Sequence, residues 1–248
     1  MELSAFFREN PRVAIAFSGG VDSAYLLYAA AQWAESVCAY FVKTAFQPNF
    51  ELRDAQRLAQ ELCIEWKVLE IPILDDCSIV SNDTNRCYYC KRRIFSAILN
   101  AAHRDGYSVL LDGTNADDRE DDRPGFRAIR ELGVRSPLRE CGLIKAEIRR
   151  LSQEAGLFTH NKPAYACLAT RIATGEEITL EKLNQTEQAE AYLHALGFRN
   201  FRVRQKNGIA KLQLIREDFP LFLQRKADIL ATLGQLYREV LPEPEERT

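Results

Sequence analysis

Six consecutive residues near the start of the chain, Ser18-Gly19-Gly20-Val21-Asp22-Ser23, constrain its fold more than any other stretch. They follow the apolar run 13–17, which predicts a buried parallel strand, and they precede residues 24–31, which predict a helix. A strand, a glycine turn and a helix N-terminus bind phosphate well, because free backbone amides and the helix dipole both favour an anion. The two glycines let phosphate oxygens approach the backbone, and the two serines add hydroxyl donors. We therefore predict a phosphate-binding loop.

The residues of this loop distinguish it from other phosphate loops. It lacks the Gly-Lys-Ser/Thr ending of a Walker A loop. It resembles the SGGxDS loop of the PP-loop ATP pyrophosphatases, which cleave ATP between its α- and β-phosphates and adenylylate an oxygen of the substrate. A simple Gly-Gly turn capped by Asp22 is the alternative, and the complete six-residue match disfavours it. The resemblance implies that all six residues bind ATP and that Asp22 and Ser23 take part in catalysis.

Strand-like and helix-like stretches alternate through the first 160 residues. Apolar runs predict further strands at 37–42, 66–71, 108–112 and 134–138, and helical spacing predicts helices at 4–10, 50–63, 87–103 and 145–155. This alternation predicts an α/β fold with a doubly wound parallel sheet, of the PP-loop (HUP-like) kind. Ligands of such sheets lie at the carboxyl ends of the strands, where the phosphate loop also lies.

Several polar residues follow these predicted strands. Gly113 comes directly after a buried strand, so a ligand or another backbone can approach it closely. Our candidate ATP-binding residues outside the loop are Gly113, Asn115 and Lys43. Asp118 is a candidate magnesium ligand, and Lys91 is a candidate catalytic residue. The charged run 119–122 fits an ordinary solvated surface segment with no role in binding.

The pattern changes after residue 160. Residues 160–171 have no clear periodicity and predict a loop, whereas 180–196 predict an amphipathic helix. Two strand-like runs, 201–205 and 209–215, flank Asn207-Gly208 and predict a hairpin, and 221–240 predict a final helix. We therefore predict a PP-loop domain over 1–160 and a smaller C-terminal α+β domain over 161–248.

Charge and hydropathy limit the partners of the chain. The formal net charge is −2, so no global basic field attracts nucleic acid. The first residues lack the basic and apolar regions of a signal peptide, and no apolar run approaches the roughly 20 residues that span a bilayer. We expect a cytoplasmic protein that binds neither nucleic acid nor a membrane, and we expect it to form a homo-oligomer.

The chain has seven cysteines, which in a reducing compartment are buried side chains, metal ligands or reactive thiols. Cys38 and Cys63 lie in strand or helix patterns and are expected in the core. Cys87 and Cys90 lie at a predicted helix start, where the dipole lowers the thiol pKa. Alone, this pair is compatible with a redox pair, half a zinc site or two unrelated thiols. With Cys167, which lies in a polar, irregular stretch, it suits an iron–sulfur cluster with one open iron.

Arg202 and Arg204 are two residues apart on a predicted strand, so their side chains project from the same face. Two neighbouring guanidinium groups match the oxygens of a phosphate monoester. Ordinary surface arginines on an exposed strand face are the alternative.

Six segments, in order, resemble the LarE family: SGGVDS at 18–23, CYYCK at 87–91, DGTNADD at 112–118, RPGFRAIRELGVRSPL at 123–138, KPAYACLATRIATGEEIT at 162–179 and FRVR at 201–204. Members of this family are ATP-dependent sulfur transferases that build the nickel-pincer nucleotide cofactor of lactate racemase. The resemblance covers nearly the whole chain. It implies ATP and Mg²⁺ as cofactors, and adenylylation of a carboxylate on pyridinium-3,5-biscarboxylic acid mononucleotide. Conversion of that carboxylate to a thiocarboxylate follows.

The resemblance also implies roles for residues of the C-terminal part, which would bind the substrate and transfer sulfur. Cys167 would be catalytic, and the substrate would be bound by Arg202, Arg204, Arg171 and Thr170. Some family members sacrifice the sulfur of the cysteine matching Cys167, which leaves dehydroalanine. Others have a set matching Cys87, Cys90 and Cys167 and are thought to hold a [4Fe–4S] cluster that carries sulfur from sulfide or another donor. The three-cysteine pattern of this chain favours the cluster.

Three other functions compete with this interpretation. A PP-loop tRNA thiolase would need an RNA-binding surface, which neither the net charge nor any Lys/Arg-rich segment supports. A nucleotide sensor without catalysis is disfavoured by Asp22, Ser23 and the cysteine set. An amidating ligase is disfavoured because its ammonia-channelling partner domain is absent.

Overall fold

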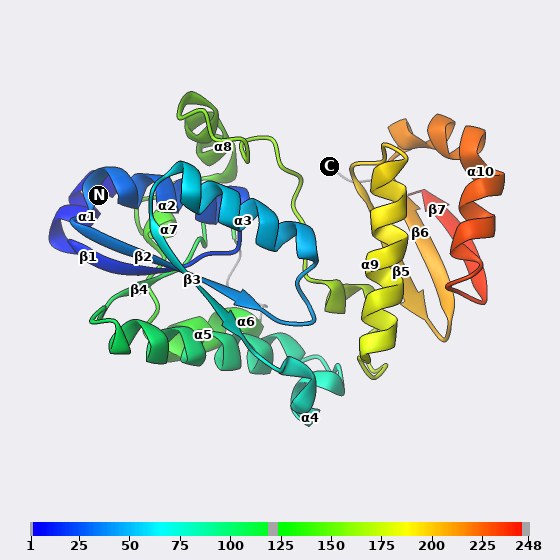
Figure 1. Ribbon diagram of the computed structural model, residues 1–248, viewed down its shortest axis with the longest axis horizontal. Helices are drawn as coiled ribbons and strands as arrows, with labels where there is room; N and C mark the ends of the chain where they lie inside the picture. The colour runs from blue at the N-terminus through cyan, green and yellow to red at the C-terminus, as the bar shows by residue number, and fades with distance from the viewer. Residues whose placement is uncertain (1, 119–123, 245–248) are drawn as a thin grey trace. The chain divides into compact units, whose positions relative to one another are not determined.

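The computed structural model describes residues 2–118 and 124–244 of the chain. By its contacts the chain divides into two compact units, drawn in Figure 1. The first unit consists of the residues up to 73 together with 85–164, and the second consists of 74–84 together with the residues from 165 onward. None of the helices in the described ranges is long and apolar enough to cross a membrane.

A four-stranded parallel sheet forms the centre of the first unit. Its strands, in the spatial order β3-β2-β1-β4, are β1 (Arg12–Ala16), β2 (Ser36–Lys43), β3 (Glu65–Glu70) and β4 (Leu110–Leu111). The strand order reverses at β1, because β2 lies on one side of it and β4 on the other. Ligands of doubly wound sheets bind at the carboxyl end of the strand at this switch point. The predicted fold class is therefore confirmed, and residues 18–23 directly follow the switch-point strand.

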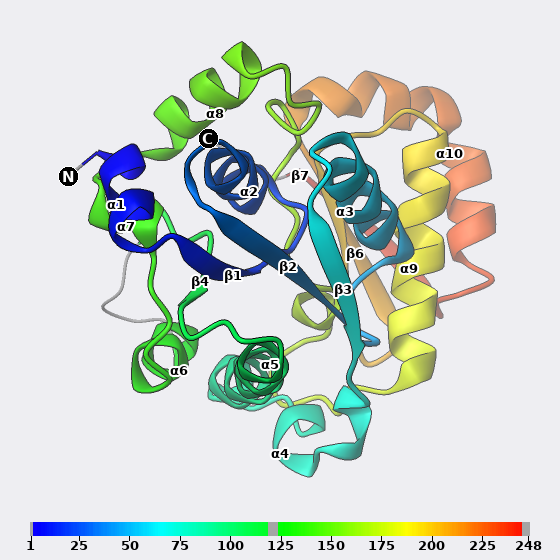
Figure 2. The same cartoon turned by 60° about the vertical axis from the view of Figure 1, so that its left-hand side comes forward.

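Helices cover both faces of this sheet. As Figure 2 shows, α2 (Val21–Trp33) and α3 (Asn49–Glu61) cover one face, and α5 (Arg86–Arg104) and α6 (Pro124–Glu131) cover the other. Three further helices pack against α2, namely α1 (Leu3–Glu9), α7 (Pro137–Glu140) and α8 (Lys145–Glu154). This arrangement explains why β1 and β2 read as almost continuous apolar runs, since both of their faces are largely buried, whereas the edge strand β3 is more polar and more exposed.

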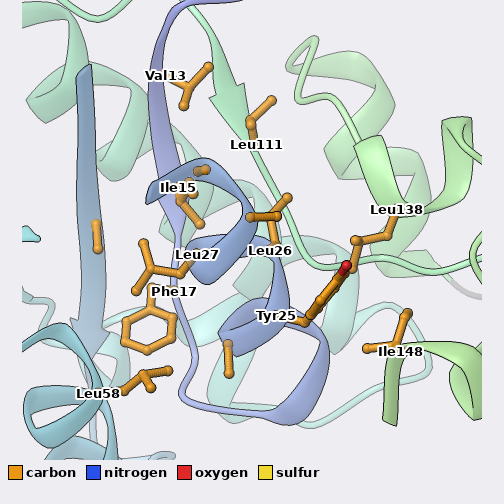
Figure 3. Close-up of a cluster of buried hydrophobic side chains, with 14 of the residues drawn as sticks. Val13, Ile15, Phe17, Tyr25, Leu26, Leu27, Leu58, Leu111, Leu138 and Ile148 are labelled. Carbon is orange, nitrogen blue, oxygen red and sulfur yellow. The ribbon is translucent and has the colours of Figure 1, made fainter. Parts of the chain in front are cut away.

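The residues of β1 alternate between two hydrophobic clusters. Val13 and Ile15 belong to the cluster under α2 and α3, whereas Ala14 belongs to the cluster under α5 and α6. In the first cluster Phe17 lies between Leu27 of α2 and Leu58 of α3 (Figure 3). Full burial of a side chain of this size contributes roughly 1.5–3 kcal/mol, so packing immobilises the chain where the loop begins.

The prediction of a strand at 134–138 is wrong. Arg135 makes a single parallel bridge with Leu111 of β4, and α7 begins two residues later at Pro137. Proline has no amide hydrogen to extend a ladder, and its fixed φ suits the first turn of a helix. The proline therefore ends the strand pairing after one residue.

The second unit is a small α+β structure. Its sheet has the order β5-β6-β7 and consists of β5 (Phe201–Lys206), β6 (Ile209–Leu214) and β7 (Glu239–Pro244). The predicted hairpin is confirmed, with Asn207 and Gly208 at φ 51° and 75° in the turn between antiparallel β5 and β6. Helices α9 (Leu180–Ala195) and α10 (Phe219–Leu233) and the 3₁₀ turns η2 (Leu168–Arg171) and η3 (Arg216–Asp218) complete the unit.

The predicted final helix is too long. It ends at Leu233, followed by Gly234 as C-cap, and residues 239–244 form β7, which pairs in parallel with β6. Tyr237 is 4% exposed and belongs to the hydrophobic cluster of this unit, so it fixes the connection between helix and strand. Pairing with β6 therefore overrides the helical pattern of the sequence.

Residues 74–84 belong to the second unit although they precede most of it by about eighty residues in the sequence. They include the end of η1 (Ile73–Asp75), all of α4 (Cys77–Val80) and the buried Asn82. The side-chain amide of Asn82 donates to the carbonyls of Ile172 and Ala173, at 3.3 and 2.9 Å. The sequence contained no signal for this placement, and the division at 160 stays a prediction.

Candidate active site

The loop 18–23 leaves β1 and enters α2 with its serines turned towards each other. The hydroxyl of Ser23 accepts from the Ser18 amide at 3.3 Å and donates to the Gly20 carbonyl at 3.2 Å. The two serine hydroxyls lie 3.0 Å apart. The amides of Val21 and Asp22 belong to the first turn of α2, where a helix provides no carbonyl partner. The serines therefore hold the loop in a shape that leaves first-turn amides for an anion.

Two glycines allow close packing around this loop. Gly19 has a φ of 73°, and a Cβ there would lie 3.3 Å from the Glu51 carbonyl oxygen of α3. A Cβ on Gly113 would lie only 2.8 Å from the amide nitrogen of Ser23. Gly113 therefore permits the backbone after β4 to touch the first turn of α2. Its predicted contact with ATP stays a prediction.

Asp22 is held by a lysine from a distant part of the chain. Its Oδ2 lies 2.5 Å from Nζ of Lys145, the first residue of α8. Its Oδ1 is buried and has no hydrogen-bond partner within the described part of the chain. A carboxylate oxygen of this kind at a phosphate loop fits a magnesium ligand, because Mg²⁺ binds one or two carboxylates together with phosphate oxygens.

A second lysine reaches the other end of the loop. Nζ of Lys162 lies 3.1 Å from the carbonyl oxygen of Gly19 and 2.6 Å from Oδ2 of Asp54 on α3. It also lies 5.4 Å from the centre of the Phe50 ring, within the range of a cation–π contact. The sequence analysis assigned a role to neither Lys145 nor Lys162.

Lys43 lies at the end of β2, at the same edge of the sheet. Its Nζ donates to the carbonyl of Gln47 at 2.7 Å and to the side chain of Asn49 at 3.0 Å. These bonds fold the chain between β2 and α3 back on itself. A role in ATP binding stays a prediction for Lys43.

The polar residues after β4 form a local network. Buried Asp112 accepts hydrogen bonds from the hydroxyls of Thr114 and Ser136, both at 2.6 Å. Asn115 is also buried; its amide donates to Oδ2 of Asp118 at 3.1 Å, and its Oδ1 accepts from the Asp117 amide at 2.9 Å. The predicted roles of Asn115 in ATP binding and of Asp118 in magnesium binding stay predictions, and the run 119–122 lies outside the described residues.

Cys87 and Cys90 occupy the beginning of α5, which starts at Arg86. They are three positions apart, so they share one side of the helix; Cys87 is exposed and Cys90 is half-buried. Cys167 precedes η2 in the second unit, and its carbonyl accepts from the Thr170 hydroxyl at 2.8 Å. Among the described residues, no three histidine, cysteine or acidic side chains form a group that could hold a metal ion. Of the three predicted cluster ligands, Cys87 and Cys90 belong to the first unit and Cys167 belongs to the second.

The other cysteines divide into two kinds. Burial raises the pKa of Cys38 and Cys141, as expected for thiols in apolar surroundings. Cys63, by contrast, is exposed, so its predicted place in the core is wrong. Cys63 lies two residues after the end of α3 and has a φ of 53°. This left-handed conformation takes the chain out of the helix, so the helical spacing that predicted a buried Cys63 does not apply to it.

Lys91 lies one residue after Cys90 and contacts aromatic rings of two helices. Its Nζ is 5.4 Å from the ring centre of Phe126 on α6 and 5.9 Å from that of Phe95 on α5. A Cβ on Gly125 would lie 2.9 Å from Cδ of Lys91, so α6 passes close to this side chain. Its catalytic role stays a prediction.

In the second unit, Arg171 forms a buried ion pair with Glu190 of α9. Arg171 is 1% exposed, and its guanidinium donates to Glu190 at 2.8 and 3.2 Å and to the carbonyl of Ala166 and the hydroxyl of Thr170, both at 2.9 Å. Burial works to lower the pKa of Arg171, but the hydrogen bonds and charge of Glu190 outweigh it and raise the pKa. This geometry ties the Cys167 segment to α9. The substrate-binding roles of Arg171 and Thr170 stay predictions.

Arg202 and Arg204 occupy the same face of β5, as their spacing predicts. Phe201, Val203 and Gln205 alternate with them and are buried. The amide of Val203 donates to Oε1 of Glu190 at 3.1 Å. Glu190 therefore connects the strand that carries the two arginines to the segment that carries Cys167. Contact of the arginines with a substrate phosphate stays a prediction.

Comparisons with known proteins agree with this geometry. Residues 1–122 match the model of the PP-loop domain. Pyridinium-3,5-bisthiocarboxylic acid mononucleotide synthase of Lactiplantibacillus plantarum is 34% identical over 240 residues, which cover 95% of this chain and 87% of that protein. The chain belongs to the LarE family.

Two uncharacterized proteins are also similar to this LarE-family chain. One, from Synechocystis, is 39% identical over 226 residues, covering 90% of the chain and 83% of that protein. The other, from Methanocaldococcus jannaschii, is 31% identical over 222 residues, covering 90% and 84%. As a LarE-family protein with a PP-loop domain, the chain is an ATP-dependent, sulfur-transferring enzyme.

Proposed function

We propose that this enzyme adenylylates a carboxylate of a pyridinium-3,5-biscarboxylic acid mononucleotide and converts it to a thiocarboxylate for a nickel-pincer nucleotide cofactor. The observation that carries the proposal is the 34% identity, over 95% of the chain, to a synthase named for the corresponding bisthiocarboxylic acid. The loop geometry supports the ATP half of the reaction. The arginine pair of β5 supports the nucleotide half.

The reaction has two steps. A carboxylate oxygen of the substrate attacks the α-phosphorus of ATP, and pyrophosphate leaves, so that the acyl group gains AMP as a good leaving group. A sulfur nucleophile then attacks the acyl carbon and AMP departs. Amides of the first turn of α2 would stabilise the leaving pyrophosphate. Mg²⁺, which neutralises phosphate charge when bound, would be held by Asp22, whose buried Oδ1 fits this role.

Substrate positioning belongs to the second unit in this proposal. Arg202 and Arg204 would bind the phosphate of the mononucleotide through paired guanidinium contacts. Glu190 contacts both the backbone of β5 and Arg171, so the arginine strand and the Cys167 segment are held by one carboxylate. When the arginines hold the substrate phosphate, the carboxylates of the bound substrate are held in a fixed direction. This lowers the entropic part of the activation barrier for the reaction with ATP.

For sulfur delivery we propose that Cys87, Cys90 and Cys167 hold a [4Fe–4S] cluster. A cluster with three protein ligands supplies an open iron at which sulfide can bind. Cys87 and Cys90 fit such ligation because neither residue is fully buried, they are three residues apart and they lie in the first turns of a helix. The alternative is that Cys167 gives up its own sulfur and becomes dehydroalanine.

One experiment decides between these routes. Each of the three cysteines is changed to Ala, and iron content, sulfur transfer and pyrophosphate release are measured under anaerobic conditions. We expect each change to remove most of the iron and all sulfur transfer, while pyrophosphate release continues, because the phosphate loop lies in another segment. The control is Cys63→Ala, which removes an exposed thiol outside the set and should retain both iron and activity.

Mass spectrometry after a single turnover completes this test. Intact Cys167 with repeated turnovers in the presence of sulfide agrees with the cluster. Dehydroalanine at position 167 together with full activity of Cys87→Ala contradicts it and assigns the sulfur to Cys167. Thiolation of tRNA by the same preparation, without reaction of the mononucleotide, would contradict the proposed substrate.

A further inference from the structure

The phosphate loop contains no cationic side chain. The triphosphate of ATP carries several negative charges, and a Walker A loop offsets part of them with its own lysine. Within 18–23 the charged residue is Asp22, which is itself acidic. Amides and a helix dipole contribute only partial charges. The cations that bind the phosphates must therefore come from other segments.

Two lysines of the first unit reach the loop from such segments. Lys145 contacts Asp22 in the first turn of α2, and Lys162 contacts the carbonyl of Gly19 at the beginning of the loop. They are separated from these loop residues by 123 and 143 positions in the sequence. One ammonium group thus lies at each end of the loop.

The backbone of each lysine is fixed by hydrogen bonds. The amide of Lys145 donates to the carboxylate of Asp117 at 2.7 Å, which holds the start of α8 against the loop after β4. The carbonyl of Lys162 accepts from Arg149 at 2.9 Å, and the carbonyl of His160 accepts from the same guanidinium at 2.7 Å. Both ammonium groups therefore project from anchored backbone, which lowers the entropy lost when they bind a ligand.

Both ammonium groups keep capacity for a ligand. In the described part of the chain, Nζ of Lys145 donates one side-chain hydrogen bond and Nζ of Lys162 donates two, out of three N–H donors each. The side chains of Lys145 and Lys162 are 31% and 16% exposed, so a ligand at the loop can reach them. Asp22 and Asp54 hold the ammonium groups in place without using all of their donors.

We propose that Lys145 and Lys162 bind the phosphate groups of ATP, one from each end of the loop, and supply the positive charge that the loop lacks. Each carboxylate partner aims its lysine at the loop. The competing explanation is that the two lysines only neutralise Asp22 and Asp54 and stabilise the fold. The two explanations predict different binding by lysine variants. If the lysines bind phosphate, their loss weakens the binding of ATP much more than that of adenosine; if they only stabilise the fold, their loss affects both ligands alike.

The first test measures the binding of ATP, AMP and adenosine to Lys145→Met and Lys162→Met by titration calorimetry. Loss of a charge-assisted contact should weaken ATP binding about ten- to hundredfold and adenosine binding less than about twofold. The control is Lys67→Met, because Lys67 also pairs with an aspartate, Asp105 at 2.8 Å, but lies on β3 beside the end of α5. It should bind all three ligands like the unmodified protein.

A second measurement covers the case in which a variant fails to fold. The unmodified protein is acetylated with a limiting amine-reactive reagent, with ATP or adenosine present, and modification of each lysine is measured by mass spectrometry. ATP should protect Lys145 and Lys162, adenosine should not, and Lys67 should react equally in both. Equal losses for ATP and adenosine, unchanged ATP binding, or no protection by ATP would overturn the proposal.

Discussion

At the scale of single residues, the close approach at Gly113 has a direct consequence. A Cβ at this position would lie 2.8 Å from the amide nitrogen of Ser23, which is a backbone atom and cannot move aside as a flexible side chain can. We expect Gly113→Ala to destabilise the protein by roughly 1–3 kcal/mol, the usual cost of overpacking, and to displace the first turn of α2. ATP affinity should fall with it. Thermal unfolding and ATP titration measure the two effects.

Gly125→Ala is the matched control for this substitution. Its Cβ would come equally close to a neighbour, at 2.9 Å, but that neighbour is Cδ of the flexible Lys91 side chain. The lysine can move aside, so stability and ATP affinity should stay near those of the unmodified protein. If both substitutions lowered stability and ATP affinity equally, the backbone contact at Gly113 would not be the cause of the loss.

The site residues that the sequence could predict are those that lie in one continuous stretch. Ser18 to Ser23 are recognisable because strand, glycines and helix follow one another directly. Lys145 and Lys162 carry no such signal, because only folding brings them to the loop from more than a hundred positions away. The contacts of Arg171 were hidden for the same reason, since its partner Glu190 lies on another helix.

At the scale of elements, Asn82 joins two segments. It is 1% exposed, has a φ of 55°, and donates two hydrogen bonds to the segment that follows Cys167. Asn82→Gly keeps this backbone conformation accessible but removes both side-chain bonds. We expect a loss of roughly 1–3 kcal/mol in stability and faster hydrogen exchange at the amides of Gly175 and Ile178, which bond to this segment.

Asn207→Gly is the control for this change. Asn207 has a similar φ of 51° but is exposed in the hairpin turn, so its replacement tests the backbone effect alone. It should change stability little. If both variants lost the same stability, the side-chain bonds of Asn82 would contribute nothing measurable.

Elements with strong local periodicity were predicted well, and elements that depend on distant partners were not. The helices α3, α5 and α8 carry their own amphipathic pattern and were predicted within two residues of their ends. β7 pairs with β6 across the intervening α10, and local sequence favoured extending that helix instead. The short α4 has only four residues, too few for any period to show.

At the scale of the whole molecule, ATP and substrate phosphate should be bound by different units. The phosphate loop belongs to the first unit, and Arg202 belongs to the second. We expect Arg202→Ala to weaken binding of the mononucleotide about ten- to hundredfold and to leave ATP binding unchanged. Calorimetric titration with each ligand measures this.

Lys211→Ala provides the comparison for this prediction. Lys211 lies opposite Arg204 in the β5–β6 pair, but its charge is already engaged by Glu243 at 3.2 Å. It should bind both ligands normally. Equal loss of ATP and mononucleotide in Arg202→Ala would place this arginine at ATP, and no loss would return it to an ordinary surface position.

The path of the chain through the two units bears on how relatives can exchange parts. The chain changes unit after residues 73, 84 and 164, so no single cut separates one unit from the other. A chimera joined at 164 would combine residues 74–84 of one parent with the 172–178 partners of the other, including those of Asn82. Functional recombinants between distant family members should therefore inherit 74–84 together with the C-terminal part. These eleven residues precede the C-terminal part in the sequence, but they should be exchanged between relatives together with it.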